Sequence, residues 1–261
     1  MKSQLENVEM IAVEAGRILR EGYGKPHTVG HKGVIDLVTE IDRQSEAFLV
    51  KEIQARFPND HILAEENGEV AGNPERVWYI DPLDGTVNYA HRVPIFAVSI
   101  AYAVKGVLQI GVVYDPMRDE CFSAERGRGA FLNQNPIHPS SAKMLGNALL
   151  VTGFPYDIWE GVDTNLDNFA MFSMRTQGVR RLGAAALDLC YVAAGRFDGY
   201  WEIKLKPWDV AAGALIVKEA GGIMTDIHGK DTFMDIPITV LAANPYIHNE
   251  MLTLLNQKDG H

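Results

Sequence analysis

The stretch of residues 78–92, WYIDPLDGTVNYAHR, constrains the fold more than any other part of the chain. The apolar run at residues 77–80 predicts a strand, and Pro82 disfavours helical backbone at Asp81, so Asp81 is expected to end that strand. Asp84 and Gly85 then turn, and residues 86–90 can begin a helix. The stretch therefore predicts a strand-to-helix junction with two neighbouring carboxylates, which requires something that compensates their charge.

Two carboxylates at such a junction favour a site for a metal ion and a phosphate. At about 4 Å and an effective dielectric near 20, a like-charged pair costs roughly 4 kcal/mol. A divalent cation such as Mg²⁺, which prefers hard oxygen ligands, removes that cost. The free backbone N–H groups of Gly85 and Thr86 would suit an anion. The plainer alternative is that Asp84 caps the helix and Asp81 lies in a solvated turn.

Further acidic residues stand at element boundaries elsewhere in the chain. Glu65 and Glu66 follow the apolar run ILA, Asp209 opens a helix in KPWDVAAG, and Asp42 leads the second helix. Each one alone is more typical of a helix cap or a surface carboxylate, whereas together they indicate a site assembled from element ends. The aspartates of DPLDGT stand three apart, which argues against a phosphatase that forms a covalent aspartyl-phosphate.

Composition and charge narrow the class of protein. The chain has 261 residues and a formal net charge of −10, which disfavours nucleic-acid binding because that role favours a basic surface. No apolar run approaches the ~20 residues of a membrane span, and glutamates interrupt the apolar pattern of the first 24 residues, unlike in a signal peptide. Cys121 and Cys190 are far apart in sequence and indicate reduced thiols. We therefore expect a cytoplasmic protein.

Hydrophobic periodicity predicts two differently organised halves. Apolar residues at helical spacing predict helices over residues 3–21 and 41–57, the second with a capping box from Thr39 to Asp42. Short apolar runs with brief connections then predict mainly antiparallel strands. After residue 147 strands alternate with helices, expected at residues 163–176, 186–195, 208–221 and 245–257. This change predicts an N-terminal α+β half, residues 1–145, and a C-terminal α/β half, residues 146–261.

Two motifs and two acidic segments together form a family signature. The pattern D-P-[LI]-D-G-T-x-N-[FY] matches Asp81 to Tyr89 without exception, and W-D-x-A-A-G matches Trp208 to Gly213. The segments DLVTEID and LAEEN add matching carboxylates. Over about residues 5–255 the chain resembles the inositol monophosphatase family. The resemblance implies a layered αβαβα sandwich of mixed α/β and α+β class, with the active site between the two halves.

The resemblance also implies a metal role for the acidic residues. Glu65, Asp81 and the carbonyl oxygen of Leu83 look like ligands of a first Mg²⁺ ion. Asp81, Asp84 and Asp209 look like ligands of a second one. A third, weaker ion would lie near Glu65, so the family implies two or three Mg²⁺ ions.

Other residues match positions that handle water, phosphate and the alcohol in the family. Asp42 and Thr86, with Glu65, would orient and deprotonate the attacking water. The alcohol would be bound with the help of Asp209, which is also a metal ligand, and by Glu202. The backbone N–H groups expected to hold the phosphate are those of Gly85 and Thr86, and the backbone segment expected to meet the substrate consists of Gly183, Ala184 and Ala185. Many relatives carry serine or threonine in place of Ala184, and Lys32 matches a flap lysine loosely.

The function that the resemblance implies is hydrolysis of myo-inositol 1-phosphate to inositol and phosphate. The reaction would be a direct attack of a metal-activated water, dependent on Mg²⁺ and sensitive to Li⁺. Fructose 1,6-bisphosphate, NADP and 3′-phosphoadenosine 5′-phosphate remain alternative substrates. A second phosphate could be bound by basic residues that would otherwise be surface charges, namely Arg180, Arg181, Lys204 and Lys206. The resemblance further implies a homodimer, and an additional regulatory role with the transcription machinery remains open.

Overall fold

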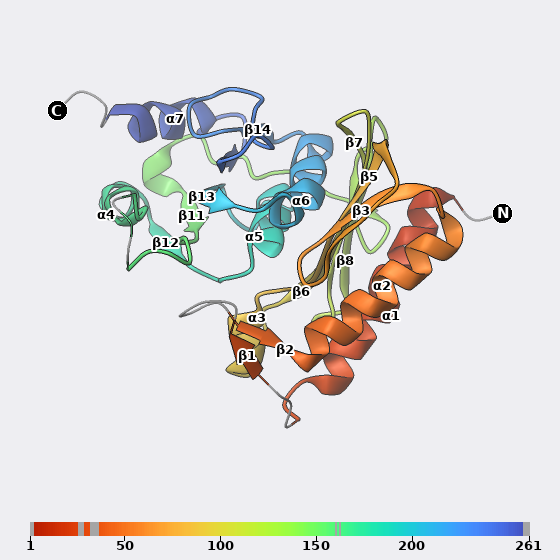
Figure 1. Ribbon diagram of the computed structural model, residues 1–261. Helices are drawn as coiled ribbons and strands as arrows, with labels where there is room; N and C mark the ends of the chain where they lie inside the picture. The colour runs from red at the N-terminus through yellow and green to blue at the C-terminus, as the bar shows by residue number, and fades with distance from the viewer. Residues whose placement is uncertain (1–2, 26–28, 32–36, 160, 162, 258–261) are drawn as a thin grey trace.

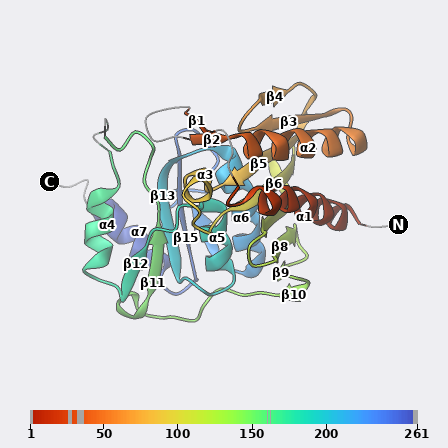
Figure 2. The ribbon, with the colours of Figure 1, turned by 90° about the horizontal axis from the view of Figure 1, so that it is seen from below.

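The protein is an αβαβα sandwich, as the resemblance implies. The computed structural model describes residues 3–25, 29–31, 37–159, 161 and 163–257, and Lys32 lies outside them. Figure 1 shows the layers in order. Helices α1 (Gln4–Gly22) and α2 (Glu40–Arg56) cover one sheet, α5 (Ala185–Ala193) and α6 (Pro207–Ala220) form the middle layer, and α4 (Leu166–Ser173) and α7 (His248–Asn256) cover the second sheet. Figure 2 shows the same arrangement from below.

The first sheet has eight strands in the order β10-β9-β8-β7-β6-β5-β3-β4. Neighbouring strands are antiparallel except β3 and β5, which run parallel. The sheet is therefore mainly antiparallel, as the short connections predict. Its strands are β3 (Asp60–Ala64), β4 (Gly68–Val70), β5 (Asn73–Asp84), β6 (Ala97–Val104), β7 (Val107–Asp115), β8 (Glu120–Glu125), β9 (Ala130–Leu132) and β10 (Asn135–Pro136).

The outer helices bury their apolar stripes on this sheet. Val8, Leu19 and Leu49 are buried in one cluster with Trp78 and Ile80 of β5. Each helix begins at a capping box, in α1 from Ser3 to Glu6 and in α2 from Thr39 to Asp42. The cap satisfies N–H groups that the first turn of a helix leaves without partners. The predicted helices and the predicted capping box of α2 are confirmed.

The second sheet has five strands in the order β12-β11-β13-β15-β14. β11 runs parallel to both of its neighbours, whereas β15 is antiparallel to β13 and β14. The middle helix α5 ends as predicted near Gly195, and Gly221 ends α6 in the left-handed region, at φ 93°. The strands are β11 (Leu149–Thr152), β12 (Gly178–Arg180), β13 (Gly199–Leu205), β14 (Ile223–Thr225) and β15 (Ile238–Ala243).

The middle layer joins the two sheets through one hydrophobic core. Buried residues of α5 and α6 pack with Ala101 and Val113 of the first sheet and with Val151 and Tyr200 of the second. α6 approaches β7 closely, because a Cβ atom added to Gly111 would lie 2.6 Å from the carbonyl oxygen of Ala212. The boundary at residue 145 falls between β10 and β11 and stays a prediction.

Some elements differ from the prediction. β5 does not end at Asp81 but continues to Asp84 across a register shift against β6. Pro82 lacks an N–H group for the ladder, so the strand bulges there instead of ending. Short elements without a repeated apolar pattern were not predicted: the pair β1 (Val29–His31) and β2 (Leu37–Thr39), and strands β4, β12 and β14. Among the described residues, no helix combines the length and apolar character that crossing a bilayer requires.

Candidate active site

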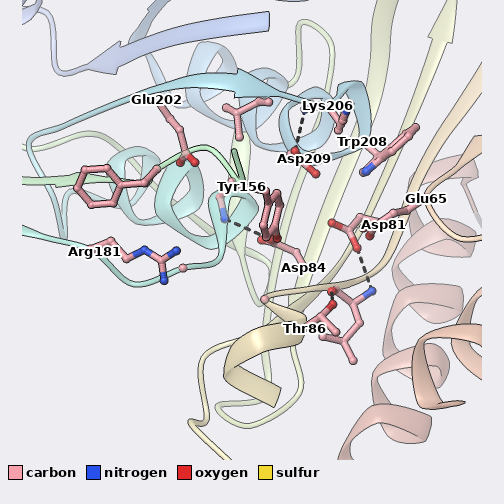
Figure 3. Close-up of a pocket in the computed structure, with 17 residues that line it drawn as sticks. Glu65, Asp81, Asp84, Thr86, Tyr156, Arg181, Glu202, Lys206, Trp208 and Asp209 are labelled. Carbon is pink, nitrogen blue, oxygen red and sulfur yellow. Dashed lines mark hydrogen bonds between the residues drawn. The ribbon is translucent and has the colours of Figure 1, made fainter. Parts of the chain in front are cut away.

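A cleft of about 270 Å³ lies where the end of β5 meets the first turns of α5 and α6 (Figure 3). The short helix α3 (Thr86–Ala90) follows β5 directly and adds its first residue to the wall. The lining residues are Glu65, Asp81, Leu83, Asp84, Gly85, Thr86, Gly153, Phe154, Tyr156, Arg181, Gly183, Ala185, Glu202, Leu205, Lys206, Trp208 and Asp209.

The bulge at the end of β5 fixes the first two carboxylates. Asp81 accepts a hydrogen bond from the backbone N–H of Leu83 at 3.0 Å. Asp84 accepts from the N–H groups of Ala185, at 3.2 Å, and Ala186, at 2.8 Å. These are N–H groups that the first turn of α5 leaves without helical partners. Asp84 therefore ties the first sheet to the middle layer at the floor of the cleft.

Two further carboxylates reach the same cleft from other elements. Glu65 follows the last residue of β3, and Asp209 stands in the first turn of α6. The Asp209 side chain accepts from the N–H of Lys206 at 2.8 Å, which holds it at the start of the helix. Four acidic side chains, from two elements and one loop, thus surround one space, as Figure 3 shows.

The environment opposes ionisation of these groups. Burial, and then the charges of Glu65, Asp84 and Asp209, raise the pKa of Asp81 well above its ordinary value. Burial raises the pKa of Asp84 to about 7, although the N–H groups of Ala186 and Ala185 work in the opposite direction. Burial and the charge of Glu65 also raise the pKa of Asp209. Carboxylates gathered in this way are stabilised as anions by a cation.

The donor set of the cleft fits Mg²⁺ in its chemistry. Four carboxylates and the carbonyl oxygen of Leu83 supply hard oxygen atoms, and the described residues that line the cleft include no histidine or cysteine. Within the described part of the chain, no three acidic, histidine or cysteine side chains are grouped tightly enough to form a ready-made metal cage. A divalent cation bound in the cleft would offset the repulsion among these carboxylates.

Behind this wall, Thr86 and Asp42 form a buried hydrogen-bonded pair. The Thr86 hydroxyl lies 2.9 Å from Asp42 Oδ1 and 3.0 Å from the carbonyl oxygen of Leu83. Asp42 also accepts from the hydroxyl and the N–H of Thr39, so both of its oxygens are occupied. Burial raises the pKa of Asp42, while the bonds from Thr39 and Thr86 lower it. Asp42 is thus a carboxylate held by several hydrogen bonds, one residue removed from the cleft.

The other end of the cleft is built around Glu202. Oε2 of Glu202 accepts from the Tyr200 hydroxyl at 2.6 Å. Burial raises the pKa of Glu202 to about 7, although this hydrogen bond and the charge of Arg181 lower it. Gly183 stands at φ 83°, in the left-handed region that favours glycine, and begins the turn into α5. The Asn88 side chain donates to the carbonyl oxygen of Leu182 at 2.8 Å and fixes this turn against α3.

Comparison with known proteins decides the family. The model of the inositol monophosphatase family matches residues 1–259. The chain belongs to the inositol monophosphatase family. This membership confirms the resemblance of the sequence and supports a phosphatase activity.

Relatives span nearly the whole chain. The protein named Nus factor SuhB of Escherichia coli (strain K12) is 43% identical over 251 residues, which are 95% of this chain and 93% of the relative. An inositol-1-monophosphatase of Synechocystis sp. is 44% identical over 254 residues, covering 96% of this chain and 88% of the relative. The crystal structure of the extragenic suppressor protein suhB from Bartonella henselae has a TM-score of 0.92 at 39% identity and covers 97% of this chain and 98% of that one.

The structure brings most of the predicted site residues of this family member to the cleft. Asp42 lies behind the cleft wall, and Ala184 is buried as the residue before α5. Of the four basic residues, Arg181 and Lys206 line the cleft, whereas Arg180 and Lys204 do not. The predicted residues that line it are Glu65, Asp81, Leu83, Asp84, Gly85, Thr86, Gly183, Ala185, Glu202 and Asp209.

Five residues that line the cleft were not predicted as site residues. Gly153, Phe154 and Tyr156 follow β11, and Leu205 ends β13. The segment GFPY carries no charged side chain, so a search for acidic groups passes over it; its position directly after a strand is the signal that could have found it. Trp208, the first residue of the W-D-x-A-A-G motif, also lines the cleft.

Proposed function

We propose that this protein is a Mg²⁺-dependent phosphomonoesterase that hydrolyses myo-inositol 1-phosphate to inositol and phosphate. The observation that carries the proposal is the cleft itself, in which four buried or half-buried carboxylates stand beside the Thr86–Asp42 pair. A cluster of acids that disfavour ionisation, next to a hydroxyl held by a proton acceptor, is typical of metal-assisted hydrolysis.

Two groups of ligands would hold the metal ions. Glu65, Asp81 and the Leu83 carbonyl oxygen would bind one ion, and Asp81, Asp84 and Asp209 a second, with a weaker third near Glu65. When bound, Mg²⁺ supplies positive charge that stabilises the developing negative charge of the phosphoryl group and of the leaving alcohol oxygen. The raised pKa values of Asp81, Asp84 and Asp209 support this assignment, because a bound cation offsets the repulsion that raises them.

The chain's own residues would activate and aim the water. The Thr86 hydroxyl donates to Asp42 Oδ1 and so offers its lone pairs to a water in the cleft. As the water attacks, its proton passes to Thr86 Oγ1 and the Thr86 proton passes to Asp42 Oδ1. Glu65 would accept the second hydrogen bond of that water. A bond forms between the water oxygen and phosphorus, the ester P–O bond breaks, and the alcohol oxygen takes up a proton from solvent.

The phosphate and the alcohol would lie at opposite ends of the cleft. The N–H groups of Gly85 and Thr86 would hold the phosphate oxygens. The Glu202 carboxylate would accept hydrogen bonds from ring hydroxyls, with backbone contacts from Gly183 to Ala185. Ala184 cannot add the hydroxyl contact of a serine or threonine, so its contribution would be limited to the backbone.

Phosphate release from a panel of esters tests the proposal. The panel contains myo-inositol 1-phosphate, fructose 1,6-bisphosphate, NADP and 3′-phosphoadenosine 5′-phosphate, each with Mg²⁺, with a chelator, and with added Li⁺. We expect the highest kcat/KM for the inositol ester, lost with the chelator and reduced by Li⁺. Preference for a bisphosphate would instead direct attention to Arg181 and Lys206, and absence of Mg²⁺-dependent release from every ester would refute the proposal.

A second candidate role is that of a Nus factor, which we propose as additional to catalysis. It rests on the name of the Escherichia coli relative that is 43% identical to this chain. A pull-down with the purified protein should then recover transcription factors, and its failure would remove this role without affecting the phosphatase proposal. We also propose a cytoplasmic homodimer, which light scattering of the purified protein would test.

A further inference from the structure

One aromatic side chain of the cleft has no place in the reaction described above. Tyr156 is 60% exposed, although it lines the cleft. In the view of Figure 3 its ring is drawn over the Asp84 side chain, with Asp209 on one side and Glu202 and Arg181 on the other. A large aromatic group presented to a binding space offers a flat apolar face to a ligand.

The loop that carries Tyr156 is anchored on both sides of it. The carbonyl oxygen of Gly153 accepts from the Asn165 side chain at 2.7 Å, and the Phe154 ring packs 5.7 Å from that of Phe169. On the other side, Asp157 accepts from Lys204 Nζ at 2.9 and 3.1 Å. Contacts to two other elements therefore hold the backbone that presents the ring.

Lys204 makes its contact from a strained position. Its φ is 59°, in the left-handed region that is unfavourable for a residue with a side chain, and it stands at a register shift of β13. Glycine would relieve the strain but would lose the ammonium group that pairs with Asp157. Strain of this kind is concentrated near functional sites, where the bulge also turns Leu205 and Lys206 to the cleft.

The start of the same loop lies directly on Glu202. A Cβ atom added to Gly153 would stand 2.2 Å from both carboxylate oxygens of Glu202, so only glycine permits this approach. The loop that carries Tyr156 and the Glu202 carboxylate thus belong to one wall of the cleft. Arg181, also in the lining, adds hydrogen-bond donors.

We infer that Tyr156 is a specificity-determining residue that stacks on the C–H face of a ring polyol phosphate, while Glu202 and Arg181 bind the hydroxyls at the ring edge. Lys204 is a positioning residue that holds Tyr156 in place through Asp157. The inference rests on the proposed phosphatase function and deepens it. The cleft of about 270 Å³ is smaller than a typical ligand pocket of about 300–1,000 Å³, which favours a compact ring over a nucleotide.

The selectivity between a ring ester and an acyclic ester tests the stacking. The ratio of kcat/KM for myo-inositol 1-phosphate to that for glycerol 2-phosphate should fall about ten-fold in Tyr156→Ala, through a higher KM for the ring ester. Tyr156→Phe keeps the ring and should retain most of the ratio. Tyr246→Ala, at a tyrosine that is 56% exposed and does not line the cleft, serves as the matched control and should leave the ratio unchanged.

The positioning role of Lys204 predicts a graded effect on the same ratio. Lys204→Ala should reduce it in the same direction as Tyr156→Ala, and Lys204→Arg should restore it, because arginine can still pair with Asp157. In the Tyr156→Ala background, Lys204→Ala should have little further effect. Lys218→Ala, which breaks the exposed Lys218–Asp231 pair of 2.8 Å, is the control for the loss of a surface ion pair.

The outcomes separate this inference from the function on which it rests. If the wild-type protein releases phosphate from neither ester, the phosphatase proposal fails. If it hydrolyses both and Tyr156→Ala reduces both equally, the stacking inference alone fails. A larger loss for 3′-phosphoadenosine 5′-phosphate than for the inositol ester would also overturn it, because the ring would then serve an adenine base.

Discussion

At the level of single residues, the acidic groups in and behind the cleft differ in their hydrogen-bond partners. Asp84 accepts two backbone N–H groups and is fixed in place, whereas both oxygens of Asp42 are bound by hydroxyl and N–H donors next to the cleft. Glu202 accepts from one phenol and faces the other end of the cleft. The same chemical group can therefore bind a metal, accept a proton or bind an alcohol, depending on its immediate partners.

Asp84→Asn should separate activity from stability. The change keeps the shape of the side chain but removes one charge from the proposed metal site, so kcat/KM should fall by roughly 100-fold or more. The melting temperature in chelator should change little, because the relief of repulsion within the acidic cluster offsets the loss of one of the two backbone hydrogen bonds that Asp84 accepts. Phosphate-release kinetics and thermal unfolding check both, with Asp231→Asn, at an exposed ion pair, as the control. Wild-type activity in Asp84→Asn would refute the role of Asp84.

Glu202→Gln should change how stability depends on pH. The pKa of Glu202 is raised from 4.5 to about 7 in the folded protein, so ionising it is harder there than in the unfolded chain. The free energy of unfolding of the wild type should therefore decrease as pH rises through this window, by roughly 3 kcal/mol at most. Glutamine does not titrate, so the stability of Glu202→Gln relative to wild type should increase from pH 4.5 to about 7 and stay constant above it.

Urea unfolding in chelator, at pH values from about 5 to about 8, measures the difference in unfolding free energy between Glu202→Gln and wild type. Glu75→Gln, at an exposed position of β5, controls for the loss of one negative charge. A stability difference between Glu202→Gln and wild type that does not vary with pH would contradict the raised pKa.

At the level of elements, the start of α2 serves both the helix and the site. Thr39 accepts from the N–H groups of Ile41 and Asp42, at 3.2 and 3.4 Å, and its own N–H donates to Asp42 at 2.9 Å. Asp42 in turn accepts from Thr86 at the first residue of α3. The capping box that begins one helix therefore also holds the proposed proton acceptor against another.

Thr39→Ala should reduce stability and activity together. Loss of the cap hydroxyl should lower the free energy of unfolding by about 1–2 kcal/mol. The same change leaves Asp42 less firmly held, so kcat/KM should also fall, whereas Thr39→Ser keeps the hydroxyl and should retain both. Urea unfolding and steady-state kinetics measure the two effects. A loss of stability with fully preserved kcat/KM would show that the cap does not position Asp42.

At the level of the whole molecule, the spacing of the layers sets the width of the cleft. Asp81 and Asp84 belong to the first sheet and Asp209 belongs to α6, so their separation depends on how closely α6 lies on that sheet. Gly111 of β7 permits this approach, since a Cβ there would meet the carbonyl oxygen of Ala212 at 2.6 Å. Gly111, which is not among the residues that line the cleft, is therefore expected to influence the distance between the proposed ligands.

Gly111→Ala should weaken the packing and the activity at once. The added methyl group has to push α6 away from β7, which should cost roughly 1–3 kcal/mol of unfolding free energy. The displacement of Asp209 relative to Asp81 should lower kcat/KM and the affinity for Mg²⁺. Gly146→Ala is the matched control, because the nearest atom to a Cβ there is the Arg175 carbonyl oxygen at 4.0 Å. Equal behaviour of the two variants would refute the spacing argument.

The sequence by itself determined the local parts of the site and the class of fold. Pro82, Gly85 and the aspartates of DPLDGT act within a few residues of one another, so their junction could be predicted from the chain alone. The amphipathic stripes of α1 and α2 and the cap at Thr39 are likewise local. The exact course of β5 through Pro82 was not predicted, because the bulge depends on the pairing with β6.

Only the tertiary structure decided which distant residues share the cleft. Asp84 accepts from Ala185, 101 positions away along the chain, and Gly153, directly after β11, lies against Glu202 of β13. The presentation of Tyr156 depends on Lys204, which is 48 positions further along the chain. These contacts arise where the middle helices bring two sheets together, and no local pattern of residues specifies them, because their geometry is set by the packing of the whole core.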